Sequence, residues 1–263
     1  MCEIGLKSND NEFIKLEAIL GLNYKPGIVN ISSENSLILI YSSGCHVIIR
    51  NFDNKKDLIL EDHVNPSLIV IDRKFLAIGD DGLKSRVTIF SISKLKKIRE
   101  IDFYHKTRII SLAFSNCGKY LGVLTFVKEN CNVDVWDWSN EDEPSPCFSQ
   151  IIRETKYPHH LEFCPEDHKI WLLVESTRLT LFCKKKEVFT LIRSKDLCLS
   201  SENRIIGAGF IHETKRIVAA TSNGHLVILS YFNAGKKAFE LRTLKNFQMK
   251  KSTITSMTIT KNA

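Results

Sequence analysis

Short stretches in which apolar and polar residues alternate return along the chain at a nearly constant spacing. A period of two places successive side chains on opposite faces of a β-strand, so each stretch predicts a strand. Five of them carry an aromatic residue or a cysteine near their ends, and their first residues lie 40, 46, 46 and 47 positions apart. They are VIIRNF from Val47, VTIFSI from Val87, VDVWDW from Val133, LTLFCK from Leu179 and LVILSY from Leu226. This regular return predicts a repeat architecture built from β-strands.

Each of these stretches belongs to a larger unit of four apolar segments. One strand and a turn precede it, a further strand stands before that, and a weaker strand follows it. Two of the turns contain Asp81-Gly82 and Asn223-Gly224, pairs that favour hairpin turns with positive φ at both central residues. Four antiparallel strands in every 40–47 residues are the pattern of a β-propeller blade.

We therefore predict an all-β fold, a β-propeller with five complete four-stranded blades and the first strand of a sixth. The predicted blades span residues 27–62, 66–103, 106–152, 156–193 and 203–245, and the partial sixth spans residues 252–260. Residues 1–26 form an N-terminal segment with a strand that could pair with the last blade. A propeller that stops after one strand of a blade leaves sheet edges open to self-association. It also leads us to expect that the sequence is part of a longer protein.

The composition is that of an ordinary folded protein. Of its 263 residues, 43% are hydrophobic and 25% are charged. Neither a run of about 18 apolar residues nor a secretory signal occurs, so we expect no membrane partner. The eight cysteines include no CxxC pair and are expected to be reduced, buried residues of a cytoplasmic protein. A formal net charge of +7 is compatible with an acidic partner.

No catalytic or cofactor-binding motif stands out in the sequence. The GxSxG, HExxH, P-loop and GxGxxG patterns are all absent. His159 and His160 would point to opposite faces of a strand, and only His160 would share a face with Cys164. Two ligands do not make a metal site. We therefore predict no enzyme activity, no cofactor and no metal.

Lysines gather at the turns that we expect at one end of the blades. In a four-stranded antiparallel sheet, the first-to-second and third-to-fourth turns emerge at the same end. Ten lysines at or beside the third-to-fourth turns form a candidate partner-binding basic face. They are Lys55, Lys56, Lys94, Lys96, Lys97, Lys184, Lys185, Lys186, Lys236 and Lys237. The third blade interrupts this face with Glu141-Asp142-Glu143.

Two interpretations of the basic face stay open. It binds an acidic surface of a partner, or its lysines keep exposed turns soluble and protect sheet edges. Nucleic acid is not expected as a partner, because most of the 15 phenylalanines fall at alternating strand positions, where core packing explains them. Nucleic-acid sites instead interleave basic residues with exposed aromatic ones.

The third blade resembles a WD repeat. Its segment FSNCGKYLGVL is similar to the turn and second strand of that family, and Trp136-Asp137 supplies the WD dipeptide. In WD repeats a histidine, a hydroxyl group, a turn aspartate and the tryptophan form a buried hydrogen-bonded network. The resemblance assigns His105, Trp136 and Asp137 to the structural WD positions, with Thr125 as the hydroxyl. The turn lacks the aspartate, and the other four blades lack the WD dipeptide.

Two of the chain's three tryptophans, Trp136 and Trp138, lie two positions apart in NVDVWDWSN. By strand alternation they point to the same face as Asp134. A pair of tryptophans on one face could stack on a ligand or pack between neighbouring blades. The position at the end of a repeated third strand favours packing between blades.

A wider set of segments resembles the WD-repeat proteins associated with cilia and flagella. The similar segments are AILGLNYKPGIVNISSENSLILIYSSGCHVIIRNFDNKK, SRVTIFSI, ISLAFSNCGKYL and NRIIGAGFIHETKRIVAATSNGHLVIL, over about residues 18–244. This resemblance implies the N-terminal propeller of a non-catalytic scaffold in the axoneme of motile cilia, within the cytoplasm and cytoskeleton. The implied partners are inner-dynein-arm or regulatory-complex proteins and acidic tubulin tails. An alternative function is a scaffold in an RNA or ribonucleoprotein assembly complex, where propellers and basic charge also occur together.

Overall fold

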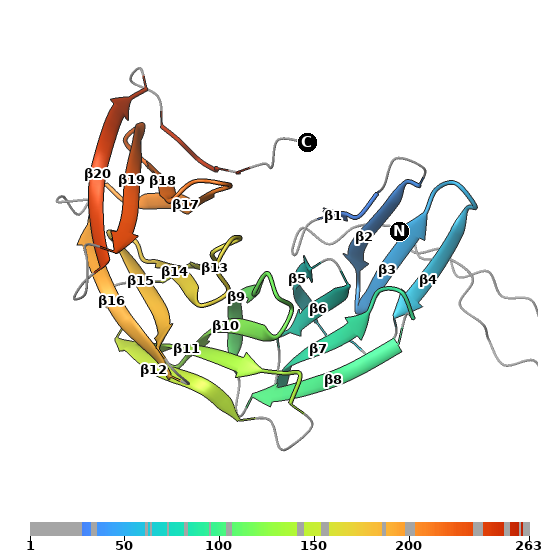
Figure 1. The fold of residues 1–263 in the computed structure, drawn as a ribbon. Helices are drawn as coiled ribbons and strands as arrows, with labels where there is room; N and C mark the ends of the chain where they lie inside the picture. The colour runs from blue at the N-terminus through green and yellow to red at the C-terminus, as the bar shows by residue number, and fades with distance from the viewer. Residues whose placement is uncertain are drawn as a thin grey trace, which may run out of the picture. The chain divides into compact units, whose positions relative to one another are not determined.

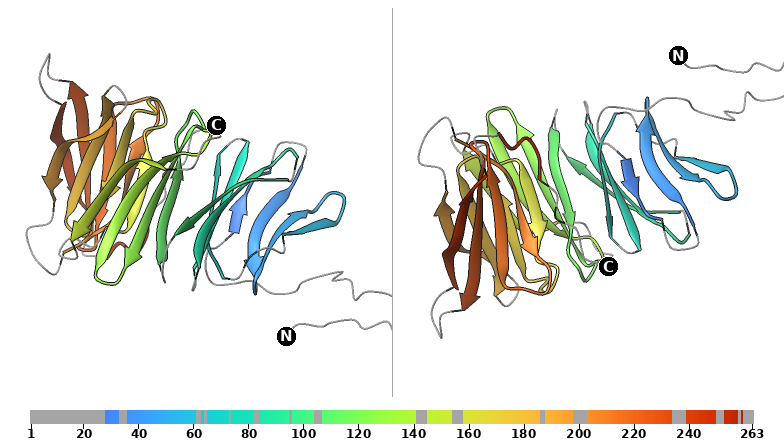
Figure 2. Two further views of the ribbon diagram at one scale, coloured as in Figure 1. Left: turned by 90° about the horizontal axis from the view of Figure 1, so that it is seen from below. Right: turned by 90° about the horizontal axis from the view of Figure 1, so that it is seen from above.

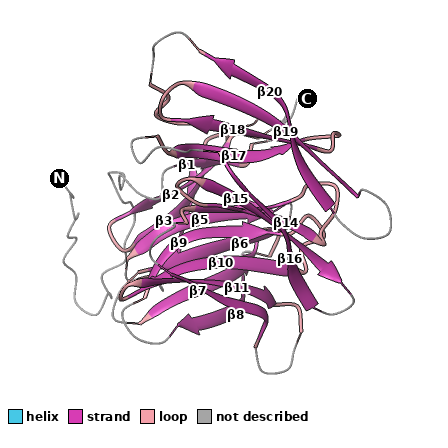
Figure 3. Cartoon of the chain, turned by 90° about the vertical axis from the view of Figure 1, so that its left-hand side faces the viewer, coloured by secondary structure: helices cyan, strands magenta, loops and turns pink. Residues whose placement is uncertain are grey.

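Every regular element in the described part of the chain is a β-strand. A computed structural model describes residues 28–32, 36–60, 63, 65–72, 74–81, 84–94, 96–103, 107–140, 145–153, 158–185, 188–197, 203–233, 239–249, 253–257 and 259. Within these ranges, twenty strands form five four-stranded sheets (Figure 1; Figure 3). These ranges contain no helix, so none is long and apolar enough to cross a membrane. The predicted all-β fold with five four-stranded sheets is confirmed.

Each sheet follows the order of the chain, with neighbouring strands antiparallel. The first sheet consists of β1 (Ile28–Asn30), β2 (Ile38–Ser43), β3 (His46–Asn51) and β4 (Lys56–Leu60). The second consists of β5 (Pro66–Asp72), β6 (Phe75–Asp80), β7 (Ser85–Ser91) and β8 (Lys96–Phe103). The third consists of β9 (Arg108–Phe114), β10 (Tyr120–Val127), β11 (Asn130–Asp137) and β12 (Pro146–Arg153).

The last two sheets repeat this plan. The fourth consists of β13 (His160–Phe163), β14 (Ile170–Val174), β15 (Arg178–Lys185) and β16 (Val188–Asp196). The fifth consists of β17 (Ile205–Ile211), β18 (Arg216–Thr221), β19 (His225–Asn233) and β20 (Phe239–Gln248).

The turn between β18 and β19 forms where the Asn-Gly pair predicts it, but Gly224 has a positive φ and Asn223 does not, so the expectation of positive φ at both residues is wrong here. Gly224 has a φ of 81°, a conformation that glycine adopts without the steric cost of a Cβ atom. Its backbone N–H donates a hydrogen bond of 3.0 Å to the carbonyl oxygen of Thr221, which closes the turn. The glycine of the second predicted hairpin pair, Gly82, lies outside the described residues.

The chain divides into two compact units. The first draws on Met1–Ile71 and Leu76–Lys106 and contains the first two sheets, whose shared core includes Ile40, Val47 and Ile78. The second unit consists of Thr107–Ala263 together with Asp72–Phe75, the tip of the β5–β6 hairpin.

Within the second unit, the three sheets stack face to face (Figure 2). Val133 and Val135 of β11 face a core that also contains Leu161 and Phe163 of β13. A second core joins the fourth and fifth sheets in the same way, with Phe210 fully buried. The apolar side chains of each sheet are therefore buried by the next sheet, as expected for consecutive propeller blades.

The C-terminal segment differs from its predicted form. The pattern predicts a strand over residues 252–260, whereas the described residues 253–257 and 259 form no strand. They lie against β17 instead, at its two inner glycines. A Cβ atom added to Gly207 would lie 3.4 Å from Cβ of Met257, and one added to Gly209 would lie 2.7 Å from Cδ1 of Ile259. The first strand of a sixth blade is therefore not formed in these residues, and the N-terminal segment 1–26 lies outside the described residues.

Candidate protein-binding surface

The turns of the second unit meet at one end of its sheets. This end carries the first-to-second and third-to-fourth turns of the third, fourth and fifth sheets, and we call it the lysine end. Contacts between sheets hold the turns together. The amide of Asn116 in the β9–β10 turn donates to the carbonyl oxygen of Pro165 in the β13–β14 turn. The backbone N–H of Glu213 in the β17–β18 turn donates to Oε1 of Glu166 at 2.8 Å.

Most of the lysines named from the sequence that the structure describes are exposed at or beside turns. In the first unit, Lys55 lies in the β3–β4 turn and Lys56 begins β4, while Lys94 lies in the β7–β8 turn and Lys96 and Lys97 begin β8. Lys97 Nζ forms an ion pair of 3.1 Å with Glu100.

In the second unit, Lys185 is exposed whereas Lys184 is half-buried. Lys186, Lys236 and Lys237 lie outside the described residues. Exposed lysines of the first-to-second turns, Lys119, Lys169 and Lys215, add to the same end.

Four side chains at the lysine end contact one another through a hydrogen bond and ring contacts. Tyr120, at the start of β10, is buried and accepts a hydrogen bond of 2.6 Å from Lys184 Nζ. The same ammonium lies 4.8 Å from the centre of the Tyr120 ring, and Lys119 Nζ lies 5.5 Å from it. The His168 ring stacks on the Tyr120 ring at 6.4 Å, with 17° between the planes. We call Lys119, Tyr120, His168 and Lys184 the Tyr120 cluster.

Asp137 supplies the carboxylate that balances part of this positive charge. Its Oδ2 lies 3.0 Å from Lys119 Nζ, and its Oδ1 accepts a hydrogen bond of 2.7 Å from Ser139. Partial burial acts to raise the pKa of Asp137, but the bonds from Ser139 and Lys119 outweigh it and hold the pKa below its usual value. The bond to Asp137 likewise raises the pKa of Lys119, so both groups stay charged at neutral pH.

The tryptophans named from the sequence lie in the protein interior. Trp136 and Trp138 are both buried. Trp138 packs edge-on against Phe75 at 4.7 Å and against Phe114 at 6.1 Å. These contacts leave no face of the Trp138 ring for a ligand. Asp137 lies at the surface in the Lys119 pair, and His105 lies outside the described residues.

The described residues contain a buried histidine–aspartate pair beside the second sheet. His63 Nδ1 lies 2.6 Å from Oδ2 of Asp80, and both side chains are fully buried. The His63 ring also contacts Phe90 of β7 at 6.0 Å, and Arg86 Nε lies 3.6 Å from Asp80. This is the histidine and turn-aspartate half of a WD-type network, with a phenylalanine beside the histidine. The sequence signal for this pair is a histidine before the first strand of the sheet, β5, and an aspartate at the end of its second strand, β6.

The histidine and cysteine residues named as candidate metal ligands can be located in the structure. The described residues contain no group of three or more His, Cys, Asp or Glu side chains that could hold a metal. Cys164 is buried, and its sulfur lies 3.2 Å from the Tyr231 hydroxyl. His160 Nε2 instead lies 3.9 Å from Glu162. The candidate ligands His160 and Cys164 therefore contact different partners.

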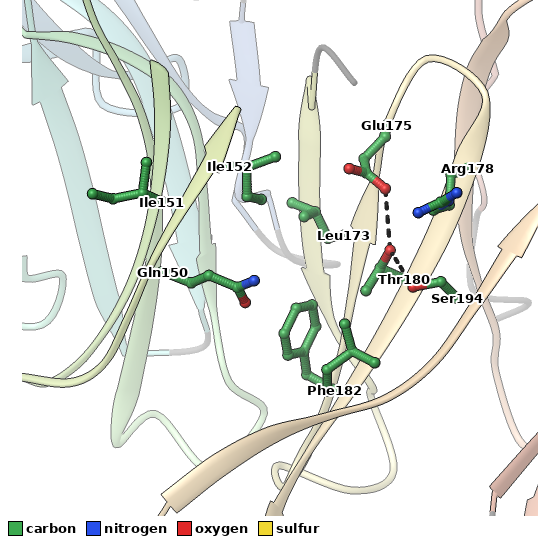
Figure 4. Close-up of a pocket in the computed structure, with 10 residues that line it drawn as sticks. Gln150, Ile151, Ile152, Leu173, Glu175, Arg178, Thr180, Phe182 and Ser194 are labelled. Atoms are coloured by element: carbon green, nitrogen blue, oxygen red, sulfur yellow. Dashed lines mark hydrogen bonds between the residues drawn. The ribbon is translucent and has the colours of Figure 1, made fainter. Parts of the chain in front are cut away.

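A pocket of about 400 Å³ lies between the third and fourth sheets, lined by residues of β12 and β14–β16 (Figure 4). Its floor includes the buried Leu173 and Phe182, and its rim includes Ile151 and Leu191, which are 66% and 52% exposed. At one side the Thr180 hydroxyl donates to Glu175 at 3.1 Å. The pocket can accommodate an apolar side chain.

Comparisons with known proteins show the fold. No protein-family model matches the sequence, and no curated protein matches it. The β-propeller domain of Cps50 (Swd1) from Myceliophteria thermophila is 18% identical, covering 73% of this chain and 57% of that one, with a TM-score of 0.53. The chain thus spans little more than half of that domain's length.

Two further structures are similar at greater coverage. A chain of a mitotic checkpoint complex is 13% identical, covering 86% of this chain and 71% of that one, with a TM-score of 0.62. A chain of the complex of KlAtg21 with the coiled coil of AgAtg16 is 14% identical, covering 84% and 70%, with a TM-score of 0.61. At these identities the similarity shows the β-propeller fold alone.

Proposed function

We propose that the chain is a non-catalytic scaffold that binds an acidic segment of a partner protein at its lysine end. The observation that carries the proposal is that turns from three consecutive sheets meet there, each sheet contributing exposed lysines. Packed sheets with exposed turns are the usual way in which such folds present binding residues. Like-charged side chains held at one end of a rigid body attract and orient a partner of opposite charge.

The structural neighbours support protein binding as the general activity. Two of them are described as assemblies, a mitotic checkpoint complex and a complex of KlAtg21 with the coiled coil of AgAtg16. Propellers of this fold therefore do occur in complexes with other proteins.

The sequence resemblance supports a more specific proposal, in which the scaffold belongs to motile cilia. The partners are then inner-dynein-arm or regulatory-complex proteins, or the acidic tails of tubulin, and the chain is located at the axoneme. A fluorescently tagged chain expressed in multiciliated cells should label the length of the cilia. A diffuse signal in ciliated and non-ciliated cells alike would contradict the ciliary assignment and leave the scaffold proposal standing.

Co-sedimentation with microtubules tests the binding surface. Charge reversal at four exposed basic residues of the lysine end (Lys169, Lys185, Lys215 and Arg216) should abolish binding in moderate salt, because long-range attraction is lost. Reversal of Lys128, an exposed lysine in the β10–β11 turn at the other end of the third sheet, is the matched control. Removal of the tubulin tails by limited proteolysis should have the same effect as the four substitutions.

Two outcomes would refute the acidic-partner proposal. Binding that survives the four charge reversals would mean that the lysines only keep the turns soluble. Binding of RNA in a salt-dependent manner, in competition with microtubules, would favour the ribonucleoprotein alternative.

A further inference from the structure

We infer that the Tyr120 cluster is a preformed subsite for one oxyanion of the acidic partner segment. The oxyanion is a side-chain carboxylate or a phosphate on a modified side chain, both of which accept charge-assisted hydrogen bonds from ammonium groups. The inference rests on the proposed function and adds to it the atoms that hold the partner.

The first argument is the preorganisation of two ammonium groups. An exposed lysine has a flexible side chain, and fixing it on a partner costs rotamer entropy. Lys184 is already fixed, because its Nζ donates to the Tyr120 hydroxyl at 2.6 Å and its ammonium lies over the rings of Tyr120 and Phe189. Lys119 is held against the same Tyr120 ring and by Asp137. An anion that binds between them is held by donors that the fold has already ordered, so little side-chain entropy is lost on binding.

The second argument is the charge balance. Lys119 and Lys184 are close enough that the charge on Lys184 acts to lower the pKa of Lys119. Asp137 supplies one carboxylate beside these two cations, and it pairs with Lys119. An added anion relieves the repulsion between the ammonium groups. The Lys119 side chain is 49% exposed, so a partner can reach it.

The third argument is that the spacing of the cluster is set by the packing of two sheets. Tyr120 and Lys119 come from the third sheet, whereas His168 and Lys184 come from the fourth. The Tyr120 ring packs edge-on against Phe189 of β16 at 5.7 Å, and both rings are buried. Lys184 is therefore held against the core, and Lys119 extends from the β9–β10 turn onto the same buried ring.

Binding of short synthetic peptides to the whole chain, measured by fluorescence anisotropy at fixed ionic strength, tests the inference. The probes are a glutamate-rich peptide, a phosphoserine peptide and a glutamine-rich control. The variants Lys119→Met and Lys184→Met remove one charge each while keeping the aliphatic stem that packs on the rings. Lys128→Met, at the other end of the third sheet, removes the same charge as a control. Tyr120→Phe removes the hydroxyl that fixes Lys184.

We expect Lys119→Met and Lys184→Met each to weaken binding of an acidic peptide about tenfold, the size of one good charge-assisted hydrogen bond. Tyr120→Phe should weaken it several-fold, and Lys128→Met should leave it unchanged. Whichever acidic probe shows the larger loss identifies the oxyanion. Thermal melts of each variant check that it folds. If Lys184→Met does not fold, Lys119→Met tests the subsite alone, because the Lys119 side chain is half-exposed and its removal should not disturb folding.

The outcomes separate the two proposals. If no acidic peptide binds better than the glutamine control, the proposed function fails. If acidic peptides bind and reversal of the four exposed basic residues of the lysine end abolishes binding, while Lys119→Met and Lys184→Met act no more strongly than Lys128→Met, the proposed function stands and the subsite is wrong.

Discussion

Replacement of Trp171 tests whether the second unit is held together by aromatic packing between its sheets. Trp171 lies on β14 and is fully buried. Its ring stacks on Phe182 of the neighbouring strand, with centroids 3.9 Å apart and 1° between the planes. Phe148 of β12 approaches it edge-on at 5.5 Å from the third sheet. The tryptophan therefore contributes both to the fourth sheet and to the contact between sheets.

The expected cost follows from this environment. Truncation of a fully buried tryptophan to alanine costs about 3–5 kcal/mol, because the transfer free energy is lost and a cavity remains. Because aromatic pairs contribute about 0.5–1.5 kcal/mol beyond their burial, the stacked and edge-on partners place the loss in free energy of unfolding for Trp171→Ala toward the upper end of the range for truncation to alanine. Such a loss is a large part of the about 5–15 kcal/mol that stabilises a typical domain.

A second substitution separates the ring from its polar atom. Trp171 Nε1 is buried without a hydrogen-bond acceptor. Trp171→Phe keeps a stacked ring and removes this donor, whose burial without a partner costs about 1–3 kcal/mol. That gain offsets the smaller volume of phenylalanine, so we expect a net change within about 1.5 kcal/mol of zero.

Urea unfolding followed by far-UV circular dichroism measures both effects, because the backbone signal does not depend on the removed tryptophan. With a slope of about 3 kcal/mol per M for a chain of this size, Trp171→Ala should lower the midpoint by about 1 M or more. Phe247→Ala on β20, where the ring is exposed, is the control and should change stability by less than about 0.5 kcal/mol. A midpoint unmoved by Trp171→Ala, or lowered equally by both Trp171 variants, would refute the reasoning.

Three further predictions concern the cores and the thiols. Gly122→Ala should destabilise the second unit by about 1–3 kcal/mol in the same urea assay, because the new Cβ would lie 2.6 Å from Leu161; an unchanged midpoint would contradict this contact. Asp80→Ala and His63→Phe should each destabilise the first unit by about 3–5 kcal/mol, because each leaves the other buried polar group without this partner; an unchanged midpoint for either variant would argue against the pair. Exposed cysteines should react with a thiol reagent within minutes at pH 8, and buried cysteines only on unfolding, since burial raises the pKa of two of the latter. Mass spectrometry should find the label first on Cys45 and Cys117 and last on Cys131, Cys164 and Cys183.

The strands of this protein could be predicted because their information is local. Alternation of apolar and polar residues fixes which face of each strand is buried, and the repeat fixes how many strands form a sheet. The same local rule does not hold for residues 253–257 and 259, where alternating residues form no strand. An isolated strand needs a partner edge, and the pattern cannot show whether one is present.

The WD-type network shows a second limit. A search for the literal dipeptide directs attention to the third blade and to His105, whereas the described histidine–aspartate pair, His63 with Asp80, lies in a sheet without a tryptophan. The pair depends on burial of both polar groups, and burial is set by the packing of sheets rather than by the identity of one neighbouring residue.

The candidate site combines residues that the sequence predicts with residues that it does not predict. Sequence reasoning finds the lysines, because turns can be located from the strands on either side. It does not find the Tyr120 cluster, because Lys184 and Tyr120 are 64 residues apart in the chain and meet only when two sheets pack.

The exposed lysines and the half-buried Lys184 contribute to binding in two different ways. Exposed lysines such as Lys169 and Lys185 act at a distance, so they raise the rate of encounter with an acidic partner and lose this effect as salt rises. Lys184 is half-buried and held by Tyr120, so its contribution requires contact and changes the lifetime of the complex instead. The lysine end can therefore attract many acidic surfaces, while the Tyr120 cluster selects among them by requiring an oxyanion at one fixed position. Net charge alone cannot provide that selection, because a solvated lysine adapts to any acidic neighbour, whereas two ammonium groups on one buried ring do not.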